Sequence, residues 1–299
     1  MPSGYLHSRC ATIAAERADI AITNKEAYQL GAHGPDPLFT LGIFPLRPKS
    51  KPKPYGKMLH TARTGLFLSA LCALAANRSD VEKAFAMGFL THYALDSAVH
   101  PYVNAHSLDA KGEYQSALHT RLENSWDVLY SGRMGMEKTP HSQSEAAVNA
   151  KACWEAAAEL LSDAARAVYP ENLLPAEEFI EAFEGAEKLG RLLRSRSAYC
   201  LAFLLERLVR QPMALTAHFM PRAPVQGDIE NAARAPWRAI LEPECVRDEG
   251  LTELFEAAII RACGLLKASG AFFAGELSAD SLAALIGNAG YDTGLESLP

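Results

Sequence analysis

In the run Thr91-His-Tyr-Ala-Leu-Asp96-Ser-Ala-Val-His100-Pro101, two histidines and an aspartate recur at intervals of four residues. Residues four apart share one face of an α-helix. At about 100° per residue, His92, Asp96 and His100 fall within an arc of about 80°. The run therefore predicts a helix that carries two imidazoles and a carboxylate along one stripe.

A second pair, His119 and Glu123, repeats the spacing of four on what is expected to be another helix, so five metal-type ligands fall within 32 residues. A single histidine on an apolar face is more often a hydrogen-bonded core residue than a ligand. The stripe, however, lies in the very apolar segment 86–95, where an unpaired aspartate costs several kcal/mol. A cation would neutralise Asp96, so the pattern favours a metal site of imidazoles and carboxylates.

The rest of the chain shows helical periodicity almost throughout and no alternating β-branched runs. This pattern predicts an all-α fold, an orthogonal bundle of many helices. We expect one domain over 1–299, with the metal site in 1–131 and a helical scaffold in 143–299. The expected helices lie near 5–22, 58–77, 79–100, 113–131, 143–168, 174–196, 198–211, 251–269 and 278–288.

Composition limits the possible functions. Apolar residues make up 49% of the chain and charged residues 21%, with a net charge of −6. An acidic chain argues against nucleic-acid binding through a basic surface.

The six cysteines form no CxxC pair, which favours free and mostly buried thiols. The N-terminus lacks a signal-peptide pattern and no stretch reaches 18 apolar residues, so we expect a cytoplasmic protein without a transmembrane segment.

Three stretches interrupt the helical pattern. Residues 31–37 form a turn rich in glycine and proline that carries Asp36, as a positioned ligand or base requires. Residues 47–57 are basic and rich in proline, which is more typical of a solvated loop than of a contact with an anionic substrate. Residues 219–250 are expected to connect helices across the surface.

The candidate ligands stand in a fixed order along the chain: His7, the turn Gly34-Pro35-Asp36, His60, the helix with His92, Asp96, His100 and Pro101, and the pair His119 and Glu123. As an ordered set they resemble the motifs of the zinc-dependent phospholipase C family, which is related to the S1/P1-type nucleases. The segments 235–237 and 254–258 also look like the C-terminal part of intracellular bacterial members.

This resemblance implies a set of zinc ligands. His60, His92 and Asp96 would hold one ion, with Asp36 close by, and a second ion would be held by His100, His119 and Glu123. A third ion would use His7, Asp96 and the amine of Pro2 after removal of Met1.

The chain departs from the family pattern in three respects. In the secreted enzymes the N-terminal residue is exposed by signal cleavage, and the early histidine lies further from it than His7 does here. The gap between Asp96 and His100 is shorter than in the secreted enzymes. His33 stands where the family often has another residue, so we expect it beside the ligands rather than among them. His106, His141 and His218 match no motif.

The activity that the resemblance implies is zinc-dependent hydrolysis of a phosphodiester with two to three ions, and the substrate it suggests is a phospholipid headgroup ester. Zinc would activate the water and stabilise charge on the phosphate, and Asp36 is the candidate that orients or deprotonates the water. No protein nucleophile or phosphate-binding glycine loop stands out. The alternatives are a nuclease or nucleotidase like the S1/P1 enzymes, and a zinc-binding structural protein. The oligomeric state is left open.

Overall fold

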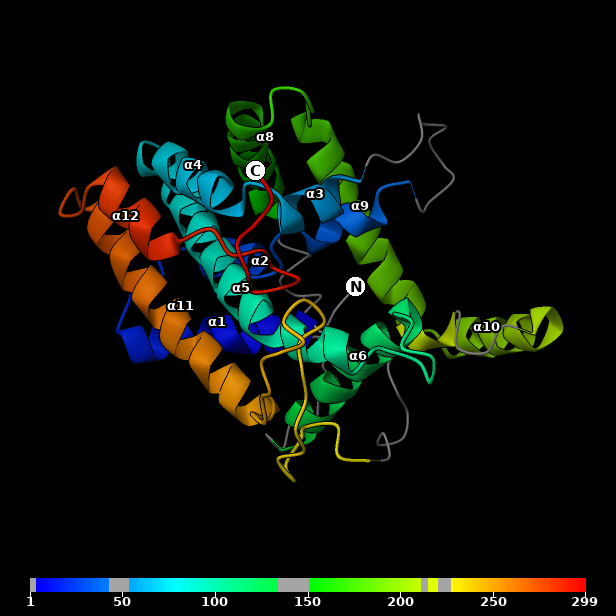
Figure 1. Ribbon diagram of the computed structural model, residues 1–299. Coiled ribbons are helices and arrows are strands. Elements are labelled where there is room, and N and C mark those ends of the chain that lie inside the picture. The colour runs from blue at the N-terminus through cyan, green and yellow to red at the C-terminus, as the bar shows by residue number, and fades with distance from the viewer. Residues whose placement is uncertain (1–3, 43–53, 134–150, 211–214, 220–226) are drawn as a thin grey trace.

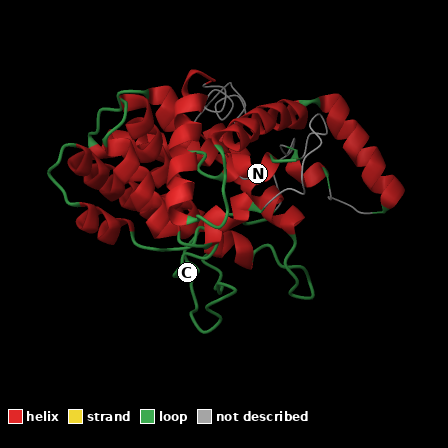
Figure 2. Ribbon diagram, turned by 90° about the horizontal axis from the view of Figure 1, so that it is seen from above, coloured by secondary structure: helices red, strands yellow, loops and turns green. Residues whose placement is uncertain are grey.

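The computed structural model describes residues 4–42, 54–133, 151–210, 215–219 and 227–299. Within these ranges the regular structure is helical and contains no strand, so the all-α prediction is confirmed (Figures 1 and 2). The elements are α1 (Gly4–Ala18), α2 (Lys25–Gly31), the 3-10 helix η1 (Asp36–Thr40), α3 (Tyr55–Thr61), α4 (Thr64–Ala76), α5 (Asp80–Ala105), α6 (Ser116–Arg133), α8 (Lys151–Val168), α9 (Ala176–Arg194), α10 (Arg196–Val209), the 3-10 helix η2 (Thr216–His218), α11 (Leu251–Phe273) and α12 (Ala279–Ile286).

Helix α5 is the centre of the molecule and is buried along most of its length. It begins at a capping box, in which Glu82 accepts a hydrogen bond from the backbone N–H of Ser79 at 3.0 Å. Helices α1, α2, α4, α8 and α11 surround it (Figure 1). The stripe with His92, Asp96 and His100 therefore lies inside the bundle, away from bulk water.

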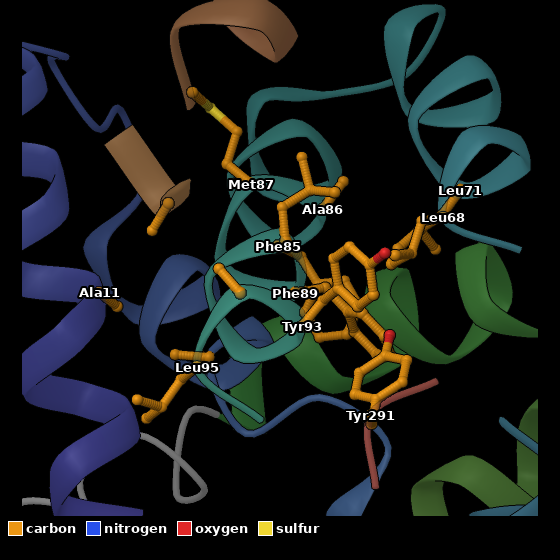
Figure 3. Close-up of a cluster of buried hydrophobic side chains, with 14 of the residues drawn as sticks. Ala11, Leu68, Leu71, Phe85, Ala86, Met87, Phe89, Tyr93, Leu95 and Tyr291 are labelled. Carbon is orange, nitrogen blue, oxygen red and sulfur yellow. The ribbon is translucent and has the colours of Figure 1, made fainter. Parts of the chain in front are cut away.

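The core beside the stripe is built from large side chains of α5 (Figure 3). Phe85, Phe89 and Tyr93 lie along one side of α5, towards Leu68 of α4 and Tyr291 of the C-terminal segment. All five side chains are buried, and burial of one such side chain stabilises a fold by about 1.5–3 kcal/mol. This apolar packing fixes α5 and with it the polar stripe.

Two glycines let α2 approach α5 at backbone distance. A Cβ atom at Gly31 would lie 2.1 Å from the carbonyl oxygen of Phe85, and a Cβ atom at Gly88 would lie 2.0 Å from that of Tyr28. Both distances are far below a van der Waals contact, so a larger residue at either position would push the helices apart. The close approach brings the 31–37 turn onto the histidine stripe.

The expected helix 58–77 is wrong, because the chain breaks into α3 and α4. Ala62 is extended and Arg63 has a φ of 50°, in the left-handed region. The C-terminal segment binds this break: Leu298 donates its N–H to Thr61 and accepts the N–H of Arg63. These long-range backbone bonds replace the helical ones, and no glycine or proline in the sequence marks the site.

Helix α5 also extends further than expected, because it continues past Pro101 to Ala105. A proline removes one N–H and so leaves one carbonyl without its helical bond, here that of Ser97. Gly294 of the C-terminal segment packs against this carbonyl, since a Cβ atom at Gly294 would lie 2.5 Å from it. The last turn of α5 therefore survives with the C-terminal segment beside it.

The described cysteines are all free. Cys10, Cys72 and Cys153 are buried as expected, whereas Cys200 and Cys245 are exposed. None of the helices in the described ranges has the length and apolar character needed to cross a bilayer.

Candidate metal centre

The structure brings the eight candidate ligands together at one end of α5 in two adjacent groups. Ligand-type atoms within each group lie within 4.8 Å of one another. The first group is Asp36, His60, His92 and Asp96, and the second is His100, His119 and Glu123. His7 adjoins the first group, with its Nε2 3.2 Å from Oδ1 of Asp96.

In the first group, Asp96 of α5 lies at the centre. Its Oδ2 lies 2.9 Å from Nε2 of His92 and 3.7 Å from Nε2 of His60. Asp36 at the start of η1 approaches the same rings, at 3.2 Å from His60 and 3.9 Å from His92. The ring of His7 from α1 stacks on that of His92, with centroids 4.2 Å apart. Four separate elements thus converge on one point.

In the second group, Glu123 of α6 holds two imidazoles. Its Oε1 lies 3.1 Å from Nε2 of His100 and 3.2 Å from Nε2 of His119. The two groups are close neighbours, because Nδ1 of His100 is only 3.8 Å from Oδ2 of Asp96. The spacing of four between Asp96 and His100 therefore joins the two groups through a single turn of α5.

Four of the histidines have Nδ1 tied to an oxygen, which leaves Nε2 to face the cluster. The partners of Nδ1 are the carbonyl of Gly56 for His60 (2.6 Å), of Ala32 for His92 (3.2 Å) and of Tyr291 for His100 (3.2 Å), and the side-chain amide oxygen of Asn104 for His119 (3.1 Å). A carbonyl can only accept, so in the neutral rings Nδ1 carries the proton and Nε2 has a free lone pair. Metal-binding histidines in proteins are typically oriented in this way.

Unpartnered buried atoms test whether a cation fits. Nε2 of His92, Oδ2 of Asp96 and Oε2 of Glu123 have no hydrogen-bond partner among the described residues. Nε2 of His92 and Oδ2 of Asp96 approach to 2.9 Å, but not with hydrogen-bond geometry. Two lone pairs at this distance repel unless a positive charge lies between them. A cation in the first group would satisfy both atoms, so the residues fit a metal ion.

The electrostatics agree with that fit. Burial lowers the pKa of His100, but Asp96 and Glu123 raise it more, so the net pKa lies well above its ordinary value. Burial raises the pKa of Asp96, but His100, His92 and His7 lower it more, so the net pKa lies well below. For Glu123, burial is outweighed by His119 and His100, and the pKa falls to about 2. The site thus keeps its carboxylates ionised and attracts positive charge strongly.

The turn before Asp36 leaves no room for a side chain at Gly34. This residue has a φ of 52°, and a Cβ atom would lie 2.2 Å from the ring of His92. We expect Gly34→Ala to lower both the free energy of unfolding and the affinity for zinc. The added methyl group would displace the ring of His92, and an alanine in the left-handed region costs about 1–2 kcal/mol in addition. Urea unfolding and zinc titration measure the two effects.

Gly112→Ala is the matched control, since Gly112 has a φ of 80° and no described atom within 4 Å of its Cβ position. It should show the strain alone, with unchanged zinc affinity. Equal zinc affinity in the two variants would contradict the assigned contact with His92.

Several residues of the site were not foreseen from the sequence. The C-terminal segment supplies the carbonyl of Tyr291 and the carboxylate of Asp292, whose Oδ1 lies 3.8 Å from Nδ1 of His100. Asn104 and Tyr114 both contact Nδ1 of His119, each at 3.1 Å. The C-terminal segment, which was expected to be scaffold, thus also contributes to the site. In the sequence, only the glycines Gly290 and Gly294 indicate a turn there.

The remaining histidines lie as follows. His33 is buried beside the first group, and burial together with His7 lowers its pKa to about 3. Its role beside the ligands remains a prediction. His106 stacks on Tyr102. His218 of η2, which matches no motif, lies in the wall of the cavity that opens from the site. Pro2, which was expected to offer its amine to a third ion, and His141 lie outside the described residues.

A cavity of about 970 Å³ opens from the site. One end is lined by Asp36, His60, His100, His119 and Glu123. The aliphatic part of the remaining wall comes mainly from α9, α10 and residues 239–241, and segments 101–120 and 292–295 add polar side chains. Cavities of this size and character typically hold small organic ligands.

Comparison with known proteins agrees with this geometry. A search of curated proteins and a search of solved structures each returned no match. The family profile described as zinc-dependent phospholipase C matches residues 6–170, a stretch that covers more than half of the chain and all eight candidate ligands. The chain therefore belongs to the zinc-dependent phospholipase C family.

Proposed function

We propose that this chain is a zinc-dependent phosphodiester hydrolase of the phospholipase C type, which cleaves a lipid-like ester on the glycerol side of the phosphate. The observation that carries the proposal is the cavity, because it joins a buried cluster of imidazoles and carboxylates to a long aliphatic wall. A phosphate would lie at the first end and an alkyl chain along the second. The cavity thus offers a polar end for the phosphate and an apolar wall for the alkyl chain of a phospholipid.

The ligand assignment follows the two groups. One ion would be held by His60, His92 and Asp96 with Asp36 beside it, and a second by His100, His119 and Glu123. His7 and Asp96 would supply two ligands to a third ion, which would need at least one further ligand. When bound, zinc would polarise the phosphate and make water a better nucleophile near neutral pH.

The chain itself contributes proton handling and orientation. Asp36 lines the cavity, and its Oδ1 lies 3.2 Å from Nε2 of His60. Burial raises its pKa, but His92 and His60 lower it more, so the net pKa lies below the ordinary value and the carboxylate stays ionised. An ionised carboxylate at the cavity wall can orient the attacking water and accept its proton. We assign this role to Asp36.

The cavity wall favours a lipid-like ester over a nucleic acid. Lys57 is the one lysine or arginine among the described residues that line it. A polynucleotide needs several cations for its phosphates and aromatic platforms for its bases. The lining includes the aromatic rings of Phe39, Tyr114 and Phe219, but a single cation does not suffice for the phosphates of a polynucleotide. The aliphatic part of the wall suits an alkyl chain.

Zinc content and substrate range test this function together. We expect the protein, purified without chelator, to contain two to three zinc ions per chain by elemental analysis. It should hydrolyse nitrophenyl phosphocholine and short-chain phosphatidylcholine. Removal of zinc should abolish turnover and lower the melting temperature, because the ligands join at least four elements. Re-addition of zinc should restore both.

The controls separate the alternatives. Turnover of single-stranded nucleic acid without turnover of phospholipid would favour the nuclease alternative. A protein fully loaded with zinc that cleaves no ester would favour a structural role. Purified protein without any transition metal would contradict the proposed centre altogether.

A further inference from the structure

Helix α10 projects from the body of the protein, at the right of Figure 1 and again at the right of Figure 2. Its sequence carries leucines at 201, 204, 205 and 208, which fall within an arc of about 100°. Their exposed fractions are 59%, 63%, 41% and 79%. Isolated exposed leucines are ordinary, but a continuous leucine stripe on a projecting helix marks an interaction surface.

The apolar surface extends beyond the helix. Leu192 of α9, Leu215 beside η2 and the loop residues Ile240 and Leu241 are also exposed, by 46%, 45%, 45% and 64%. These four residues line the cavity together with Leu201 and Leu205 of α10. The exposed surface and the cavity wall are therefore one continuous apolar surface that ends at the metal centre.

The charge of this region is opposite to that of the whole chain. Residues 191–210 contain five arginines and one glutamate, on a chain with a net charge of −6. The glutamate, Glu206, is buried and accepts hydrogen bonds from the backbone N–H groups of Leu215 and Thr216 at 2.6 and 2.5 Å. Arg196, Arg207 and Arg210 are exposed and form no ion pair within the described ranges. At about 100° per residue, these arginines lie on the side of α10 away from the leucines. A helix with one apolar face and an arginine-rich polar face is typical of helices that lie in the surface of an anionic membrane.

We propose that α10 docks this protein on an anionic phospholipid bilayer, with Leu204 and Leu208 inserted among the acyl chains and the arginines at the phosphates. The proposal rests on the proposed function, since docking would place the mouth of the cavity against the lipid that the site cleaves. A second copy of the chain fits the surface less well. A symmetric pair formed through the leucines would leave the arginines without partners, because Glu206, already hydrogen-bonded, could not neutralise them.

Vesicle flotation tests the docking directly. The full-length zinc-loaded protein should float with vesicles of equal parts phosphatidylcholine and phosphatidylglycerol, bind pure phosphatidylcholine more weakly, and lose affinity as salt is raised. The double variant Leu204→Ser/Leu208→Ser should bind the mixed vesicles about a hundredfold more weakly, or about tenfold per leucine. Neither leucine lines the cavity, so hydrolysis of soluble nitrophenyl phosphocholine should remain unchanged.

The matched control is Leu66→Ser/Leu285→Ser, which changes two leucines of similar exposure, 63% and 58%, on α4 and α12. It should bind vesicles as the unmodified protein does. Unchanged binding of the α10 variant would overturn the proposal. So would a dimer that the α10 variant, but not the control, converts to monomer in sedimentation.

The two proposals fail in different ways. Hydrolysis of the soluble ester by a protein that does not float would remove the docking proposal and leave the function. Flotation that depends on Leu204 and Leu208, in a zinc-loaded protein that cleaves no ester, would remove the function and leave the docking.

Discussion

Replacement of Asp96 by asparagine is expected to remove most of the zinc and nearly all of the hydrolysis. The carboxylate of Asp96 approaches His92 at 2.9 Å, His7 at 3.2 Å, His60 at 3.7 Å and His100 at 3.8 Å, so it lies at the junction of the two groups. An amide has the same shape but no charge, and its NH₂ group would place a donor where a cation should bind. We expect zinc affinity to fall by at least about a hundredfold and kcat/KM by about a thousandfold, or about 4 kcal/mol.

Elemental analysis, zinc titration and ester hydrolysis measure these effects. Asp163→Asn is the matched control, because it makes the same substitution in an ion pair with Arg78 that lies outside both groups. It should leave zinc content and turnover unchanged. Full zinc occupancy in Asp96→Asn would show that Asp96 is not a ligand and would remove the proposed link between the two groups.

The features that could be predicted from the sequence are those that depend on local spacing. His92, Asp96 and His100 share a face because an α-helix repeats every 3.6 residues, and the same geometry pairs His119 with Glu123. The helical pattern likewise predicted the fold class. Each of these follows from residues close together in the chain, so no knowledge of the tertiary structure was needed.

Features that depend on contacts between distant segments could not be predicted in this way. The break between α3 and α4 is held by backbone hydrogen bonds to Leu298. The hydrophobic periodicity of the sequence does not indicate such a distant partner. Tyr291 and Asp292 reach the metal centre because the C-terminal segment packs on α5 beside Pro101. Pro101 was expected to end α5, but a proline removes only one helical bond. The aliphatic cavity wall also requires the tertiary arrangement, since α9, α10 and residues 239–241 line one cavity only in the folded chain.

Asp36→Asn is expected to have the opposite profile to Asp96→Asn, with hydrolysis reduced and zinc largely retained. Asp36 contacts the first group from its edge, at 3.2 Å from His60 and 3.9 Å from His92, whereas Asp96 is central. The amide cannot accept a proton from the attacking water, so kcat should fall by about 10²- to 10⁴-fold. The three protein ligands left in the first group, His60, His92 and Asp96, are enough to hold zinc.

Asp292→Asn provides the comparison, because this second carboxylate lines the same cavity but is 41% exposed at the side chain and lies 3.8 Å from His100. If Asp36 handles the proton, Asp292→Asn should change kcat far less than Asp36→Asn does. A larger loss in Asp292→Asn would transfer the role to the C-terminal segment. Equal loss of zinc in Asp36→Asn and Asp96→Asn would mean that Asp36 acts as a ligand rather than as the base, because only a ligand's removal lowers metal content and turnover together.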